Sequence, residues 1–257
     1  MDTIYCVFPL TGQAIYGTLI RHVKRGGFMN IQGFQKMTLL DFPGKVACTV
    51  FTGGCNMRCP FCHNAGLVLT PNEYGNMTDE VLEFLPKRAG LLDGVCITGG
   101  EPLLQPDIVD FIKKVKAMGY LVKLDTNGCF PEKLKELVEG GLVDYVAMDI
   151  KNCREKYPLT VGIEGFGLEK IEESIAFLIK SGIDFEFRTT VTAELHTVED
   201  IEKIAEWIKG APKYFLQNFV DSGNLIGSNF SAHKREILHQ MRDVAAKTIS
   251  SVEVRGI

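Results

Sequence analysis

The sequence lacks a strong excess of either charge and has no long hydrophobic run. Its 257 residues carry 28 Lys and Arg against 32 Asp and Glu, which gives a net charge of −4. Proteins that hold nucleic acid through its phosphates usually present a basic patch, so we expect no nucleic-acid binding. A membrane-spanning helix needs about 20 consecutive apolar residues. No such stretch is present, and we expect no membrane association.

The first 28 residues stand apart from the rest of the chain. Their mild hydrophobicity is interrupted by residues such as Gln13 and Arg21, and it fits neither a membrane span nor a signal peptide. We treat residues 1–28 as an N-terminal extension and expect translation to start at Met29. Residues 29–257 have a length and a composition that suit a single soluble α/β domain. Without a secretory signal, the reducing cytoplasm is the expected location.

Short apolar segments alternate with amphipathic ones along most of the chain. Such alternation predicts strands and helices in turn and hence an α/β fold with a parallel sheet. About six units favour a barrel or partial barrel with its active site at the carboxyl ends of the strands. Periodicity alone does not separate this fold from a doubly wound sheet. We expect strands at 46–51, 94–98, 120–124, 143–150, 184–191, 213–218 and 251–255, and helices at 78–85, 107–118, 131–138, 168–180, 198–208 and 231–247.

Three of the eight cysteines, Cys55, Cys59 and Cys62, lie close together in a glycine-containing segment. Three thiolates are one too few to close a tetrahedral structural site, so a metal centre here would keep one position open. His63 is the nearest fourth ligand for zinc, but it adjoins Cys62, and adjacent side chains diverge. A cubane iron–sulfur cluster can bind three cysteines through three irons and leave the fourth iron open. We therefore favour a cluster over zinc.

The other five cysteines show no second cluster motif. They are scattered through apolar, strand-like or turn segments, and we do not expect disulfides in a reducing compartment. Cys48 and Cys96 fall within predicted strands and are interpreted as small core residues.

Polar or glycine-rich residues follow several predicted strands, and parallel strands would bring them to one rim. Gly99 and Gly100 let the backbone approach a ligand closely, although an ordinary turn explains them equally well. Charges at central strand ends are costly unless they are paired or liganded, so an internal ion-pair network is the alternative to ligand binding. Arg188 could equally clamp a carboxylate or close a core salt bridge. The polar rim candidates are Glu101, Lys123, Asp125, Thr126, Asn127, Asp149, Lys151 and Arg188.

The cysteine spacing carries a family resemblance. Cys-x3-Cys-x2-Cys, with Phe61 before the last cysteine, resembles the signature of the radical S-adenosylmethionine (SAM) enzymes. More narrowly, residues 33–45, 51–55 and 62–64 resemble the activating proteins of glycyl-radical enzymes, and the likeness covers about residues 29–257. The resemblance is greatest to the activating proteins of anaerobic ribonucleoside-triphosphate reductases.

The resemblance implies an incomplete (β/α)6 barrel, a [4Fe–4S] cluster on Cys55, Cys59 and Cys62, and SAM as second cofactor. Gly99, Gly100 and Glu101 would hold the methionine amino group. In the same way Asp125 would reach the ribose hydroxyls and Lys151 the carboxylate. A monovalent cation is also implied beside that carboxylate, at Asp125, Thr126 and Asp149. The full set of implied SAM contacts is Phe61, Gly99, Gly100, Glu101, Asp125, Asn127, Lys151 and Arg188.

The implied reaction is reductive cleavage of SAM followed by formation of a glycyl radical on a partner protein. The expected partner is the large subunit of anaerobic ribonucleotide reductase, with a flavodoxin or ferredoxin as reductant. One alternative is a radical SAM enzyme that acts on a pyruvate formate-lyase type enzyme or a small molecule. Another is a non-catalytic iron–sulfur or zinc module.

Two further expectations concern single side chains. Asn218 stands where pyruvate formate-lyase activases tend to have a histidine, which argues against that partner. His196, His233 and His239 have no partners at ligand spacing, so we expect them to be surface or capping residues.

Overall fold

A single mixed sheet organises the molecule. The computed structural model describes residues 29–256, so the predictions about residues 1–28 lie outside the described part. Eight strands follow one another across the sheet in chain order. Strand β1 pairs antiparallel with β2, and every later neighbouring pair is parallel. The strands are β1 Ile31–Thr38, β2 Ala47–Thr52, β3 Gly94–Gly99, β4 Leu121–Thr126, β5 Tyr145–Asp149, β6 Asp184–Val191, β7 Tyr214–Asn218 and β8 Val252–Arg255.

Within the described residues, β1 and β8 form the two edges of the sheet, which is not closed into a full barrel. The predicted α/β class and incomplete barrel are therefore confirmed. Strand β1 was not predicted, because its side chains do not alternate regularly between buried and exposed and its pairing with β2 is irregular. The antiparallel edge precedes the strand that leads to the cysteines.

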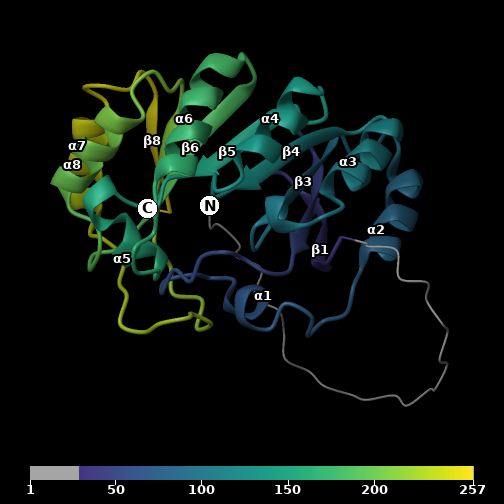
Figure 1. Ribbon diagram of the computed structural model, residues 1–257, viewed down its shortest axis with the longest axis horizontal. Coiled ribbons are helices and arrows are strands. Elements are labelled where there is room, and N and C mark those ends of the chain that lie inside the picture. Colours follow the sequence, from purple (N-terminus) through teal and green to yellow (C-terminus); the bar gives the residue numbers. More distant parts are fainter. Residues whose placement is uncertain (1–28, 257) are drawn as a thin grey trace.

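The helices lie around this sheet, and most of them occupy its outer side. In Figure 1, α3, α4 and α6 run along one margin of the view, whereas α1 and α5 lie at the opposite margin. Among residues 29–256, every helix is too short or too polar to cross a membrane. The helices are α1 Ala65–Leu69, α2 Thr78–Phe84, α3 Ile108–Ala117, α4 Pro131–Glu139, α5 Tyr157–Val161, α6 Glu169–Ser181, α7 Val198–Trp207 and α8 Arg235–Ala245, with 3-10 turns η1 Leu85–Arg88, η2 Pro102–Leu104 and η3 Arg154–Lys156.

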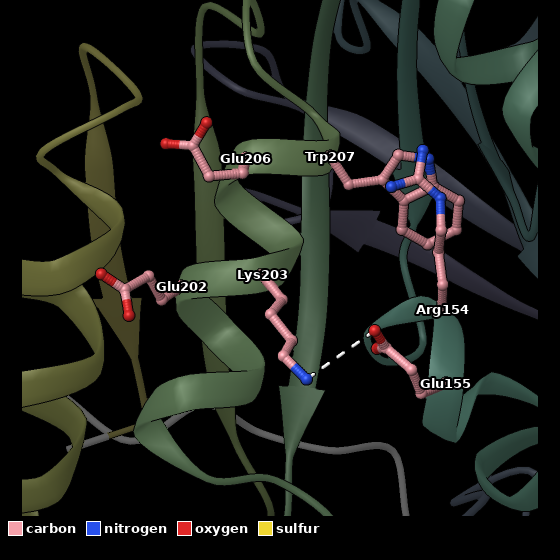
Figure 2. Close-up of a pocket in the computed structure, with 6 residues that line it drawn as sticks. All are labelled: Arg154, Glu155, Glu202, Lys203, Glu206 and Trp207. Atoms are coloured by element: carbon pink, nitrogen blue, oxygen red, sulfur yellow. Dashed lines mark ion pairs between the residues drawn. The ribbon is translucent and has the colours of Figure 1, made fainter.

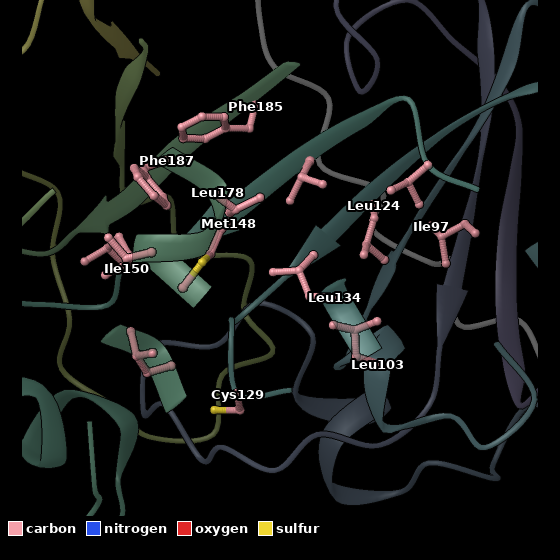
Figure 3. Close-up of a cluster of buried hydrophobic side chains, with 14 of the residues drawn as sticks. Ile97, Leu103, Leu124, Cys129, Leu134, Met148, Ile150, Leu178, Phe185 and Phe187 are labelled. Atoms are coloured by element: carbon pink, nitrogen blue, oxygen red, sulfur yellow. The ribbon is translucent and has the colours of Figure 1, made fainter. Parts of the chain in front are cut away.

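The two faces of the sheet differ in chemistry. On one face Leu124, Met148 and Phe187 are fully buried and pack with helix residues such as Leu134 and Leu178 (Figure 3). Successive side chains of a strand point to opposite faces, so the residues between these apolar ones face the other way. On β4, β5 and β6 those residues include the charged side chains of the predicted rim. The sheet thus buries an apolar face under the helices and presents a charged one.

The packing under the helices gives a test of the fold. We expect Phe187→Ala to lower the free energy of unfolding by about 3–5 kcal/mol, because the substitution leaves a cavity in the core. Leu39→Ala is the control, since Leu39 is 67% exposed and its truncation should change stability by no more than about 0.5 kcal/mol. Urea denaturation measures both values, and equal losses would contradict the described packing.

Candidate active site

The three clustered cysteines lie in the loop that follows β2. The loop is held by main-chain contacts: the Arg58 N–H donates to the Val161 carbonyl of α5 at 2.9 Å. Within the loop, the Cys62 N–H donates to the Cys59 carbonyl at 3.0 Å, which closes a tight turn. Cys59 is buried, whereas Cys55 and Cys62 are half-buried. The structure therefore brings the three predicted ligands together on one anchored loop.

The glycine turn after β3 packs directly against this loop. The Glu101 N–H donates to the Gly54 carbonyl at 2.8 Å. A Cβ on Gly100 would lie 1.9 Å from the Gly54 oxygen, and one on Gly99 would lie 2.3 Å from the Thr52 nitrogen. Gly99 also has φ of +115°, a value that other residues rarely adopt. Close packing of the two turns thus requires both glycines, whatever ligand they hold.

The side chain of Glu101 is fully buried and joins the ends of two strands. It accepts hydrogen bonds from the Leu103 N–H at 3.0 Å, the Thr126 hydroxyl at 2.8 Å and the Asn127 N–H at 2.7 Å. Burial raises the pKa of Glu101 to about 7, and the three donors oppose that rise. The carboxylate therefore orders the turns after β3 and β4. Its predicted contact with SAM stays a prediction.

Asn127 connects β4 to the cysteine loop. Its side-chain nitrogen donates to the Asn56 side-chain oxygen at 2.8 Å and lies 3.9 Å from Cys55 Sγ. The Met57 N–H also points at Cys55 Sγ, at 3.4 Å. Donors to this sulfur stabilise its thiolate form, which is the form that binds metal.

Burial disfavours the thiolate form of each of the three cysteines. Burial raises the pKa of Cys55 to about 11 and that of Cys59 to about 12, and it raises the pKa of Cys62 as well. The nearby Lys151 ammonium lowers all three pKa values. Lys151 is thus a cation that the neighbouring strand end places beside the cysteines.

The charged strand ends form one chain of ion pairs across the face of the sheet opposite the helices. Lys123 pairs with Asp125, and Arg188 pairs with Asp125 at 3.2 Å. Arg188 also pairs with Asp149 at 2.9 Å, and Lys151 pairs with Asp149 at 2.9 Å. Asp149 and Arg188 are register partners on β5 and β6. The internal network is therefore present, and Arg188 closes a salt bridge in the core.

Electrostatics within this chain keep the aspartates ionised. Burial alone would raise the pKa of Asp149, but Arg188 and Lys151 lower it to about 2. Arg188 and Lys123 likewise lower the pKa of Asp125 against the effect of burial. Each buried charge thus depends on its neighbours of opposite sign.

The residues of the predicted cation site are only partly brought together. Asp125 and Asp149 both contact Arg188. The Thr126 hydroxyl instead donates to Glu101 and accepts from the Gly128 N–H. The monovalent cation stays a prediction.

The described part of the chain has no group of side chains placed to bind a single metal ion. Within residues 29–256, no three His, Cys, Asp or Glu side chains are arranged to hold one ion. A cubane cluster needs a different arrangement, because each cysteine binds a separate iron. His63, the candidate zinc ligand, stacks on Phe219 with ring centroids 5.2 Å apart. The chemistry and placement of the three thiols fit a cluster.

His196 is only 1% exposed, so its assignment as a surface or capping residue is wrong. The Thr192 N–H donates to Nδ1 at 3.1 Å, and Nε2 lies 2.8 Å from the Lys151 carbonyl. We infer the tautomer with the proton on Nε2, because the carbonyl needs a donor. Phe61 packs edge-on against the same ring at 6.1 Å. This role could not be predicted from local sequence, since Lys151 lies 45 residues away.

His233 and Asn218 continue the hydrogen bonds of His196 as far as the end of β7. His233 Nε2 donates to the His196 carbonyl at 2.9 Å, and the His233 N–H donates to the Asn218 side chain at 3.0 Å. Asn218, which ends β7, therefore fastens the following segment to the rim. This is a structural role, and it needs no contact with a cofactor.

Comparison with known proteins identifies the class of this fold and site. Residues 49–215 match the model of the Radical SAM superfamily. The crystal structure of Streptococcus suis SuiB bound to S-adenosylmethionine shares the fold, with a TM-score of 0.63 at 13% identity over 80% of this chain. The match covers 49% of SuiB, so this chain spans about half the length of that protein.

Two curated relatives narrow the class to a family. A Methanocaldococcus jannaschii protein, named as a candidate glycyl-radical enzyme activating enzyme, is 34% identical over 236 residues, which cover 88% of this chain and 96% of that protein. The pyruvate formate-lyase-activating enzyme of Clostridium pasteurianum is 31% identical over 191 residues, 70% of this chain and 76% of that protein. The chain belongs to the radical SAM superfamily, in the family of glycyl-radical enzyme activating enzymes. Membership implies a [4Fe–4S] cluster and SAM as cofactors.

A separate pocket of about 330 Å³ is lined by residues of α7 and η3 (Figure 2). The Arg154 guanidinium lies 4.6 Å from the centre of the Trp207 ring, and Lys203 pairs with Glu155 at 3.7 Å. Both members of that pair are more than half exposed, so solvent screens the interaction. None of the lining residues belongs to the rim described above.

The ion-pair chain gives a testable difference between buried and exposed pairs. We expect Arg188→Met to lower the free energy of unfolding by about 3–5 kcal/mol near neutral pH, because Asp125 and Asp149 lose their shared counterion. Lys203→Met, which breaks the exposed pair with Glu155, should cost no more than about 1 kcal/mol. Urea denaturation compares the two variants. Similar losses in both would show that Arg188 does not hold the charged face together.

The buried imidazole predicts a pH dependence of stability. Burial lowers the pKa of His196 to about 4, from 6.5 in an unfolded chain. As the pH falls through this window, the unfolded chain binds the proton first, so the fold loses up to about 3 kcal/mol. His196→Gln should flatten this part of the pH profile, although it also lowers stability at pH 7. Urea midpoints of both proteins from pH 7 to pH 4.5 measure the effect, and parallel profiles would contradict it.

Proposed function

We propose that this chain cleaves SAM reductively and generates a glycyl radical on a partner enzyme, which is anaerobic ribonucleoside-triphosphate reductase. The observation that carries the proposal is the anchored loop with Cys55, Cys59 and Cys62 beside the Lys151 ammonium, at the carboxyl ends of parallel strands. The names of the relatives support the glycyl-radical part. The resemblance in residues 33–64 supports the choice of reductase.

The three cysteines would hold the [4Fe–4S] cluster. The donors around Cys55 and the positive charge of Lys151 favour the thiolate forms that such a cluster requires. When bound, the cluster supplies the electron that divides SAM into methionine and a 5′-deoxyadenosyl radical. The 5′-deoxyadenosyl radical would take a hydrogen atom from the glycine Cα and become 5′-deoxyadenosine, so the reaction would need no general base. The protein's tasks are to position the reactants and to exclude water.

SAM would lie across the charged rim. Lys151 has three N–H donors and one partner, Asp149, so it can also bind the methionine carboxylate. Main-chain groups of Gly99, Gly100 and Glu101 would take the amino group. Asp125 would bind the ribose hydroxyls, and the further proposed contacts come from Phe61, Asn127 and Arg188. A cation at Asp125, Thr126 and Asp149 would have to displace Arg188, so we assign it no step.

A second candidate partner is an enzyme of the pyruvate formate-lyase type. It is favoured by the relative from Clostridium pasteurianum, and it is disfavoured by Asn218 in place of the histidine typical of those activases. For either partner we propose a flavodoxin or ferredoxin as reductant and the cytoplasm as the location. A non-catalytic iron–sulfur or zinc module is the alternative outside this class.

Anaerobic reconstitution with iron and sulfide tests the cluster assignment. We expect the Cys59→Ala variant to retain no cluster iron, because the loop then offers only two thiolates. Its rate of SAM cleavage under dithionite should fall at least about 100-fold. Cys48→Ala is the control, since Cys48 is a buried core residue of β2 and its loss should cost only packing. Iron analysis and 5′-deoxyadenosine release are the measurements. Wild-type protein that holds zinc and no iron would support the non-catalytic alternative.

Electron paramagnetic resonance of candidate partners tests the substrate. Incubation with SAM, reductant and the large subunit of the reductase should yield a glycyl doublet on that subunit. Pyruvate formate-lyase, treated in the same way, is the comparison. A doublet on the lyase alone would show that the lyase, and not the reductase, is the substrate. If neither partner gains a doublet while SAM is still cleaved, the substrate is of another kind.

A further inference from the structure

Tyr157 is a fully buried tyrosine beside the cysteine loop. It begins α5, and its ring stacks on Phe166 with centroids 5.7 Å apart and meets Trp207 edge-on at 5.9 Å. These contacts fix the ring and hence the direction of the hydroxyl. A buried hydroxyl normally forms a hydrogen bond, because the cost of leaving it without one is about 1–3 kcal/mol.

The other buried tyrosines of the described chain satisfy this rule. The hydroxyl of Tyr120 donates to the Leu85 carbonyl at 2.7 Å. Tyr145 donates to Glu186 at 2.8 Å, and Tyr214 donates to the Thr189 hydroxyl at 2.7 Å.

Among residues 29–256, the Tyr157 hydroxyl has no such partner. The main-chain N–H of Lys151 approaches its oxygen, but this group is itself a donor. The phenolic proton therefore lacks an acceptor within the described protein.

Tyr157 lies on the helix that packs against the loop of the proposed cluster ligands. Helix α5 is fastened to the cysteine loop by the hydrogen bond from Arg58 to Val161. Gly162, which ends α5, packs so closely that a Cβ there would lie 2.4 Å from the Arg58 oxygen. The hydroxyl of Tyr157 also interacts electrostatically with Lys151, with Cys129 and with Cys59. A group bound to Cys59 would bring sulfur atoms, which accept hydrogen bonds, to this side of the loop.

We propose that Tyr157 donates its O–H hydrogen bond to a sulfur atom of the bound cluster or of its Cys59 ligand and thereby favours the reduced cluster. This inference rests on the proposed function, because it requires the cluster at Cys55, Cys59 and Cys62. Reduction adds negative charge to the sulfur atoms, so a hydrogen bond to one of them is stronger in the reduced state. Tyr157 is thus a positioning and tuning residue that need not touch SAM or the glycine.

The test is a redox titration of the reconstituted cluster without SAM, followed by electron paramagnetic resonance. Tyr157→Phe keeps the ring and removes only the hydroxyl. We expect its midpoint potential to be more negative than that of wild type, with the reduced-to-oxidised ratio at a fixed potential lowered about tenfold. Tyr214→Phe is the matched control, since it removes a buried hydroxyl that bonds to Thr189, and it should leave the potential unchanged.

A second substitution tests the opposite direction. Replacing Tyr157 by 3-fluorotyrosine makes the phenol a stronger donor, so the midpoint potential should rise above that of wild type. Unchanged potentials in both variants, with iron content equal to wild type, would overturn the role of Tyr157 and leave the proposed function intact. A shift of equal size in Tyr214→Phe would also overturn it. Wild-type protein that takes up no cluster would instead reject the proposed function.

Discussion

Arg188 stands between two aspartates on the charged face of the sheet, and the arrangement of the rim depends on this contact. Charges buried on neighbouring strands cost several kcal/mol each unless opposite charges lie next to them. In the series of ion pairs from Lys123 through Asp125, Arg188 and Asp149 to Lys151, cations and anions alternate, so each charge has a neighbour of opposite sign. The series has three cations and two anions, and it ends at Lys151, whose ammonium lowers the pKa of the three cysteines while Glu101 and Asp149 oppose it.

The turns above this charged face are fixed by their backbones. Gly99 and Gly100 leave no space for a side chain, because the turn after β3 lies against the turn after β2. Glu101 then ties the same turn to the end of β4. The cysteine loop is therefore held by the protein's own contacts with neighbouring turns. Such preorganisation lowers the conformational entropy that metal binding has to overcome.

The parallel sheet and the grouping of polar strand ends could be predicted from the sequence, because both follow from local periodicity and from the geometry of parallel strands. The cysteine loop could also be predicted, because its three cysteines lie within eight residues of the sequence. His196 and Tyr157 could not be found in this way. His196 contacts the segments that follow β5 and β6, and Tyr157 on α5 contacts Trp207 on α7, so both sets of contacts join distant parts of the sequence. Neither residue lies in a recognisable motif. The sequence leaves ion pairing and ligand binding open for the charged strand ends, because the cross-strand position of Arg188 depends on the register of β5 and β6.

The hydrogen bonds of His196 bear on which metal the rim accepts. With Nδ1 occupied by Thr192 and Nε2 by Lys151, the imidazole has no lone pair for an incoming ion unless the strand ends separate. Zinc commonly completes a thiolate site with histidine nitrogen. The hydrogen bonds of His196 to its own backbone therefore exclude this imidazole as a fourth, zinc-type ligand, and they hold the ends of β5 and β6 together instead.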